Sequence, residues 1–258
     1  MIYLGILIQM TIKSVNIIVP LKNEEKGIKN LIDSLMPVVS KINKKINISL
    51  IDDHSIDQTW DIIKKYETEI DHITGYKNTN SSGFGNALKF GIEKNTDDAL
   101  IIFMGDCSDD PQDIVQYIKY LDEGYDCVFG SRFINGSSLK DYPFLKLIIN
   151  RLANNFIKIL FWIKYNDITN AFKAYKKETL NSCYPIISQH FNINAELSLK
   201  SIIRRFKYKV IPISWTNRKE GTSKFQIKEM RNRYFFIIFY IFLEKLLMKE
   251  DIFKDRKY

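Results

Sequence analysis

Three carboxylates follow a short apolar run in the first half of the chain. Residues 99–103 are all apolar, and the next segment contains Asp106, Asp109 and Asp110 just before Pro111. Carboxylate oxygens are the ligands that Mg²⁺ and Mn²⁺ prefer, and such an ion can clamp a phosphorylated substrate. The same residues can instead begin a helix, because Asp is a good N-cap residue and Pro suits a first turn. The segment alone therefore predicts either a metal site or a helix cap.

Polar segments in the second half contain cations of the kind that hold phosphate groups. Arg132 follows the run 126–129, and its guanidinium can bind a phosphate through two parallel hydrogen bonds, although a solvated loop cation fits the tetrapeptide equally well. Residues 215–224 form a polar loop that can close over an anionic substrate. Residues 167–175 indicate either a turn before a strand or a piece of an acceptor site.

The elements that must position these residues follow an alternating pattern. Short β-branched runs alternate with amphipathic stretches, which predicts an α/β fold with a mostly parallel sheet covered by helices. Strands are expected at 15–19, 46–51, 72–76, 99–103, 126–129 and 207–213, and helices at 25–39, 57–70, 83–94, 111–121 and after Pro143. Because ligands bind beyond the carboxyl ends of such strands, we expect segments 20–24, 52–55 and 105–110 to converge.

Size and charge set limits on the kind of protein. The 258 residues, 45% of them hydrophobic, can form one large core, or a core with a small appendage. The formal charge of +8 fits an anionic partner such as a nucleotide or a lipid phosphate. No nucleic-acid-binding signature is visible in the sequence, so we expect no nucleic-acid partner.

Several common kinds of site are excluded or weakened by spacing. The three cysteines are far apart, which argues against a zinc site or a disulfide framework and fits a reducing cytoplasm: Cys107, Cys127 and Cys183. The Gly83-Phe84-Gly85 segment lacks the third glycine and the leading strand of a dinucleotide-binding motif, and no P-loop sequence occurs. The isolated His72 and His190 are expected to be ordinary surface or core residues.

An ordered series of motifs resembles the inverting family 2 glycosyltransferases of the dolichyl-phosphate (polyprenyl-phosphate) mannosyltransferase type. The resemblance covers the chain from Val15 to about Lys228. It rests on seven segments in the family's order: 19–24, 51–55, 83–87, 105–111, 130–132, 167–172 and 218–224. Each segment is modest alone, but the ordered set favours the metal-binding interpretation of the acidic segment over the helix cap.

The resemblance implies a GT-A-type, Rossmann-like nucleotide-diphospho-sugar transferase fold. The glycosyltransferase domain would span 14–228, with a donor-binding half at 14–130 and an acceptor-binding half at 131–228. An N-terminal extension (1–13) and a C-terminal amphipathic helix with a tail (229–258) would flank it. The donor site implied by the family comprises Pro20, Glu24, Gly83 and one of two aspartates, Asp52 or Asp53, which recognises the base or ribose. An Asx turn is the alternative role for these aspartates.

The acidic segment departs from the family's commonest pattern, in which an Asp-x-Asp pair precedes a proline. Gly105 and Cys107 occupy those two positions here. The resemblance therefore implies a shifted set, with Asp106 and Asp109 binding Mg²⁺ or Mn²⁺ and Asp110 as a further candidate ligand, since a cysteine is too soft for magnesium.

The implied reaction moves a sugar from GDP-mannose or a UDP-sugar to a polyprenyl or dolichyl phosphate. A lipid phosphate is already anionic, so it needs no strong general base, and the protein's task is electrostatic and positional. The catalytic residues implied are Asp106, Asp109, Arg132 and Arg218. The residues implied for the acceptor phosphate are Arg132, Lys146, Asn150, Ser223 and Lys224.

The C-terminal run 234–243 is apolar but shorter than the roughly 20 residues that span a bilayer. We interpret it as an interfacial helix or a docking surface for a separate membrane-anchoring subunit, with an ordinary core helix as the alternative. Residues 1–10 lack the features of a signal peptide. These patterns predict peripheral association with the cytoplasmic face of a membrane.

Two other functions remain open from the sequence. A family 2 enzyme acting on a sugar hydroxyl, in polysaccharide or glycan assembly, would need a base, for which Asp167 or Glu196 is a candidate. A noncatalytic nucleotide-binding protein on the same fold is conceivable because of the altered Asp-x-Asp pair.

Overall fold

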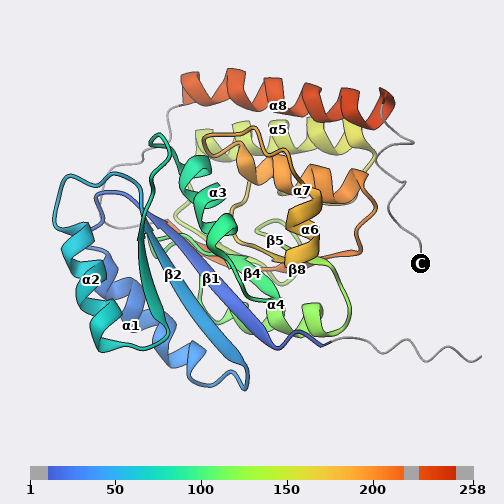
Figure 1. Ribbon diagram of the computed structural model, residues 1–258. Helices are drawn as coiled ribbons and strands as arrows, with labels where there is room; N and C mark the ends of the chain where they lie inside the picture. Colours follow the sequence, from blue (N-terminus) through green and yellow to red (C-terminus); the bar gives the residue numbers. More distant parts are fainter. Residues whose placement is uncertain (1–10, 218–226, 248–258) are drawn as a thin grey trace, which may run out of the picture.

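The computed structural model describes residues 11–217 and 227–247, with only the backbone for 227–231. A seven-stranded sheet has the order β3-β2-β1-β4-β7-β5-β8 and crosses the molecule in Figure 1. Its strands are β1 (Ser14–Leu21), β2 (Lys45–Asp52), β3 (Ile73–Lys77), β4 (Ala99–Ile102), β5 (Cys127–Ser131), β7 (Lys173–Lys176) and β8 (Tyr208–Pro212). A second, two-stranded sheet pairs β6 (Ser138–Lys140) with β9 (Ser214–Thr216).

Helices cover both faces of the large sheet, because alternate side chains of each strand point to opposite faces. One core includes Ile17 and Val19 of β1, and the other includes Ile18 between them. The first core contains α1 (Ile28–Val39), α2 (Thr59–Glu69) and α4 (Asp113–Asp122). The second contains α3 (Phe84–Lys94), α5 (Phe144–Phe161), α6 (Lys177–Ser182), α7 (Ile193–Ile203) and α8 (Ile227–Leu247). The expected α/β fold, with a mostly parallel sheet covered by helices, is confirmed.

Three details differ from the sequence-based expectations. Pro20 does not end the first strand but lies inside β1. The strand tolerates it because the pairing with β4 ends at Ile18, so no N–H is needed from residue 20 on that side. Ile12, placed in the N-terminal extension, is buried in the core. Trp215 and Thr216, expected in the polar loop 215–224, belong to β9.

Strand β7 runs antiparallel between β4 and β5, while the other pairings in the sheet are parallel. The start of an antiparallel strand lies at the edge where its parallel neighbours end. Residues 167–172, which lead into β7, therefore reach the edge at which β1, β2, β4 and β5 finish. The sequence left open whether 167–175 was a turn before a strand, and the structure has that arrangement.

Helix α8 lies beside α5 and packs on α7 (Figure 1). Its inner side chains Ile237, Ile238 and Ile241 are buried in the second core, whereas Phe235 and Phe236 are exposed. The helix thus contributes to the core, as in the alternative that the sequence left open, and it also presents exposed apolar side chains.

At Gly85, helix α3 lies very close to the backbone that precedes α7. A Cβ atom at Gly85 would lie 2.6 Å from the carbonyl carbon of Gln189 and 2.7 Å from the backbone nitrogen of His190. We expect Gly85→Ala to lower the free energy of unfolding by about 1–3 kcal/mol in urea denaturation, because the backbone of residues 189–190 must move. Gly27→Ala is the control, since its nearest neighbour would be an ordinary 3.4 Å away. Equal stability of the two variants would contradict this close approach.

Candidate active site

A cavity of about 970 Å³ lies at the carboxyl edge of the large sheet. Loops after β1, β2 and β4 form part of its wall, and α5 and α8 form another part. Of the residues expected in the site, the cavity is lined by Pro20, Glu24, Asp53, Gly83, Asp106, Asp109, Arg132, Lys146 and Asn150. The expected convergence of segments 20–24, 52–55 and 105–110 is confirmed.

Hydrogen bonds join the loops after β1 and β2. The backbone N–H of Asn23 donates to Ser55 Oγ at 2.9 Å, and the N–H of Ile56 donates to Asn23 Oδ1 at 2.9 Å.

The loops after β1, β2 and β4 each contain a non-glycine residue in the left-handed region: Asn23, His54 and Cys107, with φ of 49°, 58° and 55°. Such backbone conformations cost about 1–3 kcal/mol each and cluster at functional sites. The sharp turns concentrate strain around this cavity.

The two adjacent aspartates after β2 have different environments. Asp53 lines the cavity, and its carboxylate accepts hydrogen bonds from the N–H of Gly83 at 2.9 Å and the side chain of Asn78 at 2.9 Å. Asp52 is buried outside the cavity lining and accepts the N–H of Ser55 at 3.3 Å, which is an Asx-type turn. Of the two candidates for donor recognition, the structure brings Asp53 to the cavity.

The backbone N–H groups in the first turn of α3 are already bonded to another part of the chain. The N–H groups of Gly85 and Asn86 donate to the carbonyl oxygen of Gln189 at 3.0 and 3.2 Å. A helix N-terminus binds a phosphate through these same amide groups. Their occupation agrees with the sequence-based argument against a dinucleotide-binding glycine motif at this helix.

The acidic segment separates into a part that lines the cavity and a part that does not. Asp106 and Asp109 line the cavity, whereas Asp110 does not and instead accepts the N–H of Gln112 at 2.9 Å. Asp110 thus closes a turn just before α4, but it is not the helix cap that the sequence offered as an alternative, because the N-cap residue of α4 is Gln112. The segment also pairs with β9, because the N–H of Thr216 donates to Ser108 O at 2.9 Å and that of Asp110 donates to Ser214 O at 3.2 Å.

Asp109 is a buried carboxylate whose two oxygens have no hydrogen-bond partner among the described residues. Burial raises the pKa of Asp109 well above its usual range, the charge of Asp106 adds to this, and the charge of Arg132 opposes it. Partial burial likewise raises the pKa of the Cys107 thiol to about 11, with Asp106 adding, so the thiol stays protonated. Two hard carboxylates, one of them unpartnered, fit a divalent cation better than the thiol does.

No group of three or more His, Cys, Asp or Glu side chains is arranged to hold a metal ion within residues 11–217 and 227–247. A cation held by Asp106 and Asp109 would therefore need further oxygen ligands, and a substrate phosphate or water can provide these.

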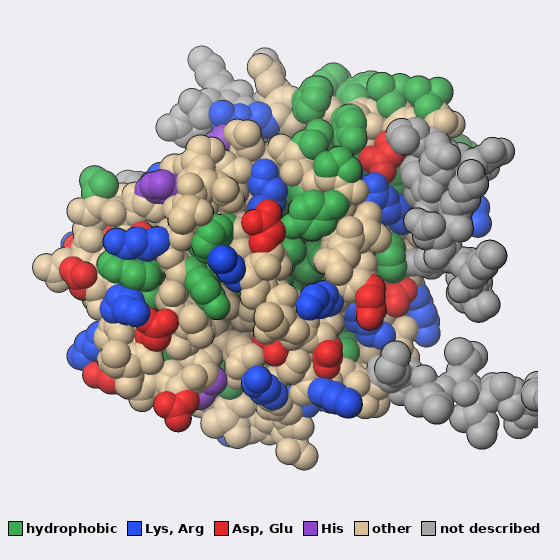
Figure 2. Space-filling model, viewed as in Figure 1, with side chains coloured by type: hydrophobic (Ala, Val, Ile, Leu, Met, Phe, Trp, Pro, Cys, Tyr) green, Lys and Arg blue, Asp and Glu red, His purple; other side chains and the backbone are tan. Residues whose placement is uncertain are grey.

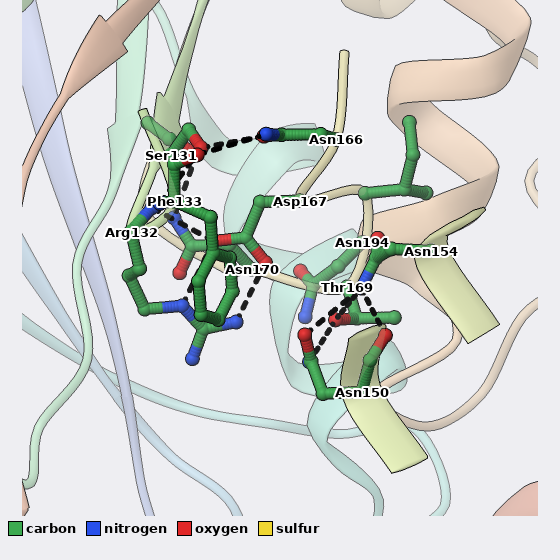
Figure 3. A network of polar contacts seen from close by, with 12 residues as sticks. Ser131, Arg132, Phe133, Asn150, Asn154, Asn166, Asp167, Thr169, Asn170 and Asn194 are labelled. Carbon is green, nitrogen blue, oxygen red and sulfur yellow. Dashed lines mark hydrogen bonds and ion pairs between the residues drawn. The ribbon is translucent and has the colours of Figure 1, made fainter. Parts of the chain in front are cut away.

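Arg132 is locked by a bidentate pair with Asp167. Its Nε and Nη2 atoms donate to the two carboxylate oxygens at 2.8 and 2.7 Å, and its backbone N–H donates to the same group at 3.0 Å (Figure 3). Burial alone would lower the pKa of the guanidinium, but the charge and hydrogen bonds of Asp167 outweigh burial and raise the pKa. The rings of Phe133, Tyr142 and Trp215 lie within 6 Å of its guanidinium carbon. Arg132 is a charged, fixed group on the cavity wall.

Of the other residues expected to hold the acceptor phosphate, two line the cavity and three lie outside the described residues. Lys146 and Asn150, on the first turns of α5, both line the cavity. Asn150 donates to Thr169 Oγ1 at 2.9 Å, which ties α5 to the turn before β7. Arg218, Ser223 and Lys224 lie outside the described residues.

Neither carboxylate suggested as a base for a hydroxyl acceptor lines the cavity. Asp167 is fully buried in its pair with Arg132. Glu196 is fully buried in a pair with Lys200 at 2.7 Å and accepts the N–H groups of Ile187 and Ser188. Both carboxylates act as structural anchors, so that expectation is not supported.

Sequence reasoning missed several cavity residues. His190, expected to be an ordinary surface or core residue, lines the cavity beside Gly83. Phe84 and Phe191 stack with ring centroids 4.4 Å apart and also line it. Their distance in the sequence hides the pairing: Phe84 lies in segment 83–87 of the motif series, but no motif marks Phe191.

Comparisons with known proteins were consistent with this geometry. Residues 16–184 match the family model described as Glycosyl transferase family 2. A polyprenol monophosphomannose synthase of Mycolicibacterium smegmatis is 24% identical over 85% of this chain and 83% of its own length. A dolichol-phosphate mannosyltransferase of Pyrococcus furiosus is 25% identical over 83% of this chain and 60% of its own length.

A third relative and a solved structure extend these matches. An undecaprenyl-phosphate 4-deoxy-4-formamido-L-arabinose transferase of Shewanella sediminis is 28% identical over 65% of this chain and 50% of its own length, so the chain spans only half of that protein. Glucosyl-3-phosphoglycerate synthase of Mycobacterium tuberculosis, solved with Mn²⁺, UDP and glucosyl-3-phosphoglycerate, superposes with a TM-score of 0.65 at 14% identity. The match covers 90% of this chain and 80% of that one, and shows a shared fold.

The buried state of Asp109 predicts a gain of stability when its charge is removed. Because the pKa of Asp109 is raised in the folded state, the unfolded chain releases this proton at a lower pH than the folded chain does. The free energy of unfolding of the metal-free protein therefore falls as the pH rises above the ordinary aspartate range. We expect Asp109→Asn to increase the free energy of unfolding in EDTA, and to do so more at pH 8 than at pH 5. Asp110→Asn, at a residue outside the cavity, should change stability by no more than about 0.5 kcal/mol. Urea denaturation at both pH values measures this, and a destabilised Asp109→Asn at pH 8 would contradict it.

Proposed function

The chain belongs to glycosyl transferase family 2, and from this premise we propose that it transfers a sugar from a nucleotide-sugar donor to a polyprenyl phosphate at a membrane surface. The donor would be GDP-mannose or a UDP-sugar. The observation that carries the proposal is a single cavity with charged groups at the sheet edge and apolar side chains on α5 and α8.

The donor would lie at the edge formed by the loops after β1, β2 and β4. Pro20, Glu24 and Asp53 line that part of the cavity. Asp106 and Asp109 would hold Mg²⁺ or Mn²⁺. When bound, such an ion neutralises negative charge on a departing nucleoside diphosphate. Asp109 supports this role, because a buried carboxylate without hydrogen-bond donors is stabilised by a cation.

The acceptor phosphate would lie at the other charged group, Arg132, with Lys146 and Asn150 on α5 as further contacts. Asp167 and the surrounding rings fix the guanidinium, so little conformational freedom is lost on binding. A phosphate monoester is anionic at neutral pH and needs no general base. This agrees with the structural use of Asp167 and Glu196, the two carboxylates considered as a base.

The apolar part of the cavity reaches an exposed apolar face. Ile149, Phe156 and Phe235 line the cavity and are also exposed at the surface of α5 and α8. Figure 2 shows hydrophobic side chains gathered along the upper edge of the molecule, where Figure 1 places α8. The exposed large apolar residues of these two helices are Phe144, Leu145, Ile148, Ile149, Leu152, Phe156, Ile159, Phe235, Phe236, Phe239, Leu243, Leu246 and Leu247.

A bilayer is the partner that this apolar face fits best. Exposed apolar patches of this kind mark interaction surfaces. Helix α5 contains Lys146, Arg151 and Lys158 and no acidic residue, which suits the anionic surface of a membrane. Within the described residues, no helix has the length and apolar character needed to cross a membrane. We propose a peripheral contact through the exposed apolar side chains of α5 and α8.

A transfer assay tests the function directly. We expect the wild type, with Mn²⁺ and a radiolabelled donor from a panel of GDP-mannose, UDP-glucose and UDP-N-acetylglucosamine, to label polyprenyl phosphate. Asp106→Ala should lose most of the metal-dependent transfer, while Asp110→Ala should retain it, because Asp110 does not line the cavity. The proposal fails if the wild type labels polyprenyl phosphate with none of these donors.

Flotation with vesicles of phosphatidylcholine and phosphatidylglycerol tests the membrane contact. We expect Leu152→Glu and Ile159→Glu to weaken binding at least about tenfold each, since burying one large apolar side chain contributes roughly 1.5–3 kcal/mol. Ile56→Glu is the matched control, because Ile56 is 93% exposed but lies outside α5 and α8. Similar losses for all three variants would rule out this face as the membrane contact.

A further inference from the structure

Asn194, on the first turn of α7, has a side-chain amide that the fold leaves unused. The residue is only 1% exposed, yet it lines the cavity. Its Oδ1 atom is buried and has no hydrogen-bond partner among the described residues. A buried polar group without a partner costs about 1–3 kcal/mol, so natural proteins rarely keep one without a reason.

The surroundings of Asn194 are neutral and polar. Asn150, Thr169 and Asn170 line the same cavity, and we call these three residues with Asn194 the amide recess. Figure 3 shows Asn150, Thr169 and Asn194 near one another, and Asn170 on the side of Arg132 and its partner Asp167. Asn170 donates to Gly130 O at 3.2 Å, and Asn150 donates to Thr169 Oγ1 at 2.9 Å. None of the four carries a charge, which separates this part of the cavity from the guanidinium.

The recess is held in place from behind by the buried Lys173. Its ammonium donates to Ile168 O at 2.7 Å, to Asn194 O at 2.8 Å and to Ser198 Oγ at 2.8 Å. These bonds tie the turn before β7 to the first turns of α7, so Thr169, Asn170 and Asn194 keep fixed relative positions. Fixed positions are what a specific polar site requires.

The unpaired atom of Asn194 is an acceptor, so its ligand must supply a hydrogen. A phosphate dianion has only acceptor oxygens and would leave Oδ1 unpaired beside a negative charge. A hydroxyl group can donate to Oδ1 and accept from a neighbouring amide at the same time. Burying a charge in a recess of neutral side chains would also be costly. A carbohydrate hydroxyl therefore fits the recess better than a phosphate does.

We propose that the amide recess binds hydroxyl groups of the transferred sugar and that Asn194 is a specificity-determining residue for that sugar. This inference rests on the proposed function, because the ligand that it names is the sugar of the proposed donor. A site built to hydrogen-bond a hydroxyl rejects analogues that lack it, because its own polar groups are then left unpaired.

Isothermal titration calorimetry can distinguish the contribution of the sugar to binding affinity from that of the nucleotide. The titrants are GDP and GDP-mannose, then UDP and UDP-glucose, each with Mn²⁺. We expect Asn194→Ala to weaken binding of the nucleotide sugar that the wild type binds by about 3- to 12-fold, which corresponds to the loss of one neutral hydrogen bond. Binding of the matching nucleoside diphosphate should be unchanged, and this unchanged affinity also shows that the variant is folded.

Asn192→Ala is the matched control on the same helix start. Asn192 is also buried and its Oδ1 also lacks a partner, but it does not line the cavity. We expect this variant to bind the nucleotide sugar like the wild type. Unchanged nucleotide-sugar affinity in Asn194→Ala overturns the inference, and so does an equal loss for nucleotide and nucleotide sugar. A raised KM for polyprenyl phosphate with unchanged donor affinity would instead assign the recess to the acceptor. If the wild type binds no nucleotide sugar, the proposed function itself fails.

Discussion

A buried carboxylate without hydrogen-bond donors is the constraint around which this cavity is organised. Asp106 and Asp109 both lie on the loop after β4, and neither carboxylate oxygen of Asp109 has a hydrogen-bond partner among the described residues. Two like charges in a desolvated place oppose each other, and the free protein bears that cost. The arrangement becomes favourable when positive charge enters the cavity. The metal-free protein is thus less stable because of these carboxylates, and they lie where the proposed cation would bind.

The second charged group solves a different problem. Arg132 must remain ionised although it is almost fully buried, and Asp167 provides the opposing charge that makes this possible. The pair also fixes the end of β5 to the turn before β7, so one ion pair both holds a cation and shapes the wall. Breaking a buried pair by removing one partner leaves a charge uncompensated. Asp167 is therefore best understood as the partner that positions Arg132.

Sequence reasoning reached the sheet and the convergence of its loops because both follow from periodicity and from the geometry of parallel strands. It could not separate Asp109 from Asp110, since neighbouring aspartates look alike until the backbone shows which side chain enters the cavity. It could not place Asn194 either, because a polar residue on an apolar helix carries no motif. His190 and the Phe84–Phe191 stack depend on contacts between segments about 100 residues apart. Such contacts are set by tertiary packing.

The pairing of the acidic loop with β9 has a consequence for exchanging parts between relatives. Residues 108–110 bond to residues 214–216 through the backbone, and the N–H of Ser214 also donates to Asp113 at 2.8 Å. A loop grafted in from another protein would keep these bonds only if its backbone followed the same path along β9. The segment carrying Asp106 and Asp109 and the strand around Trp215 therefore behave as one transplantable unit, although about 100 residues of chain separate them.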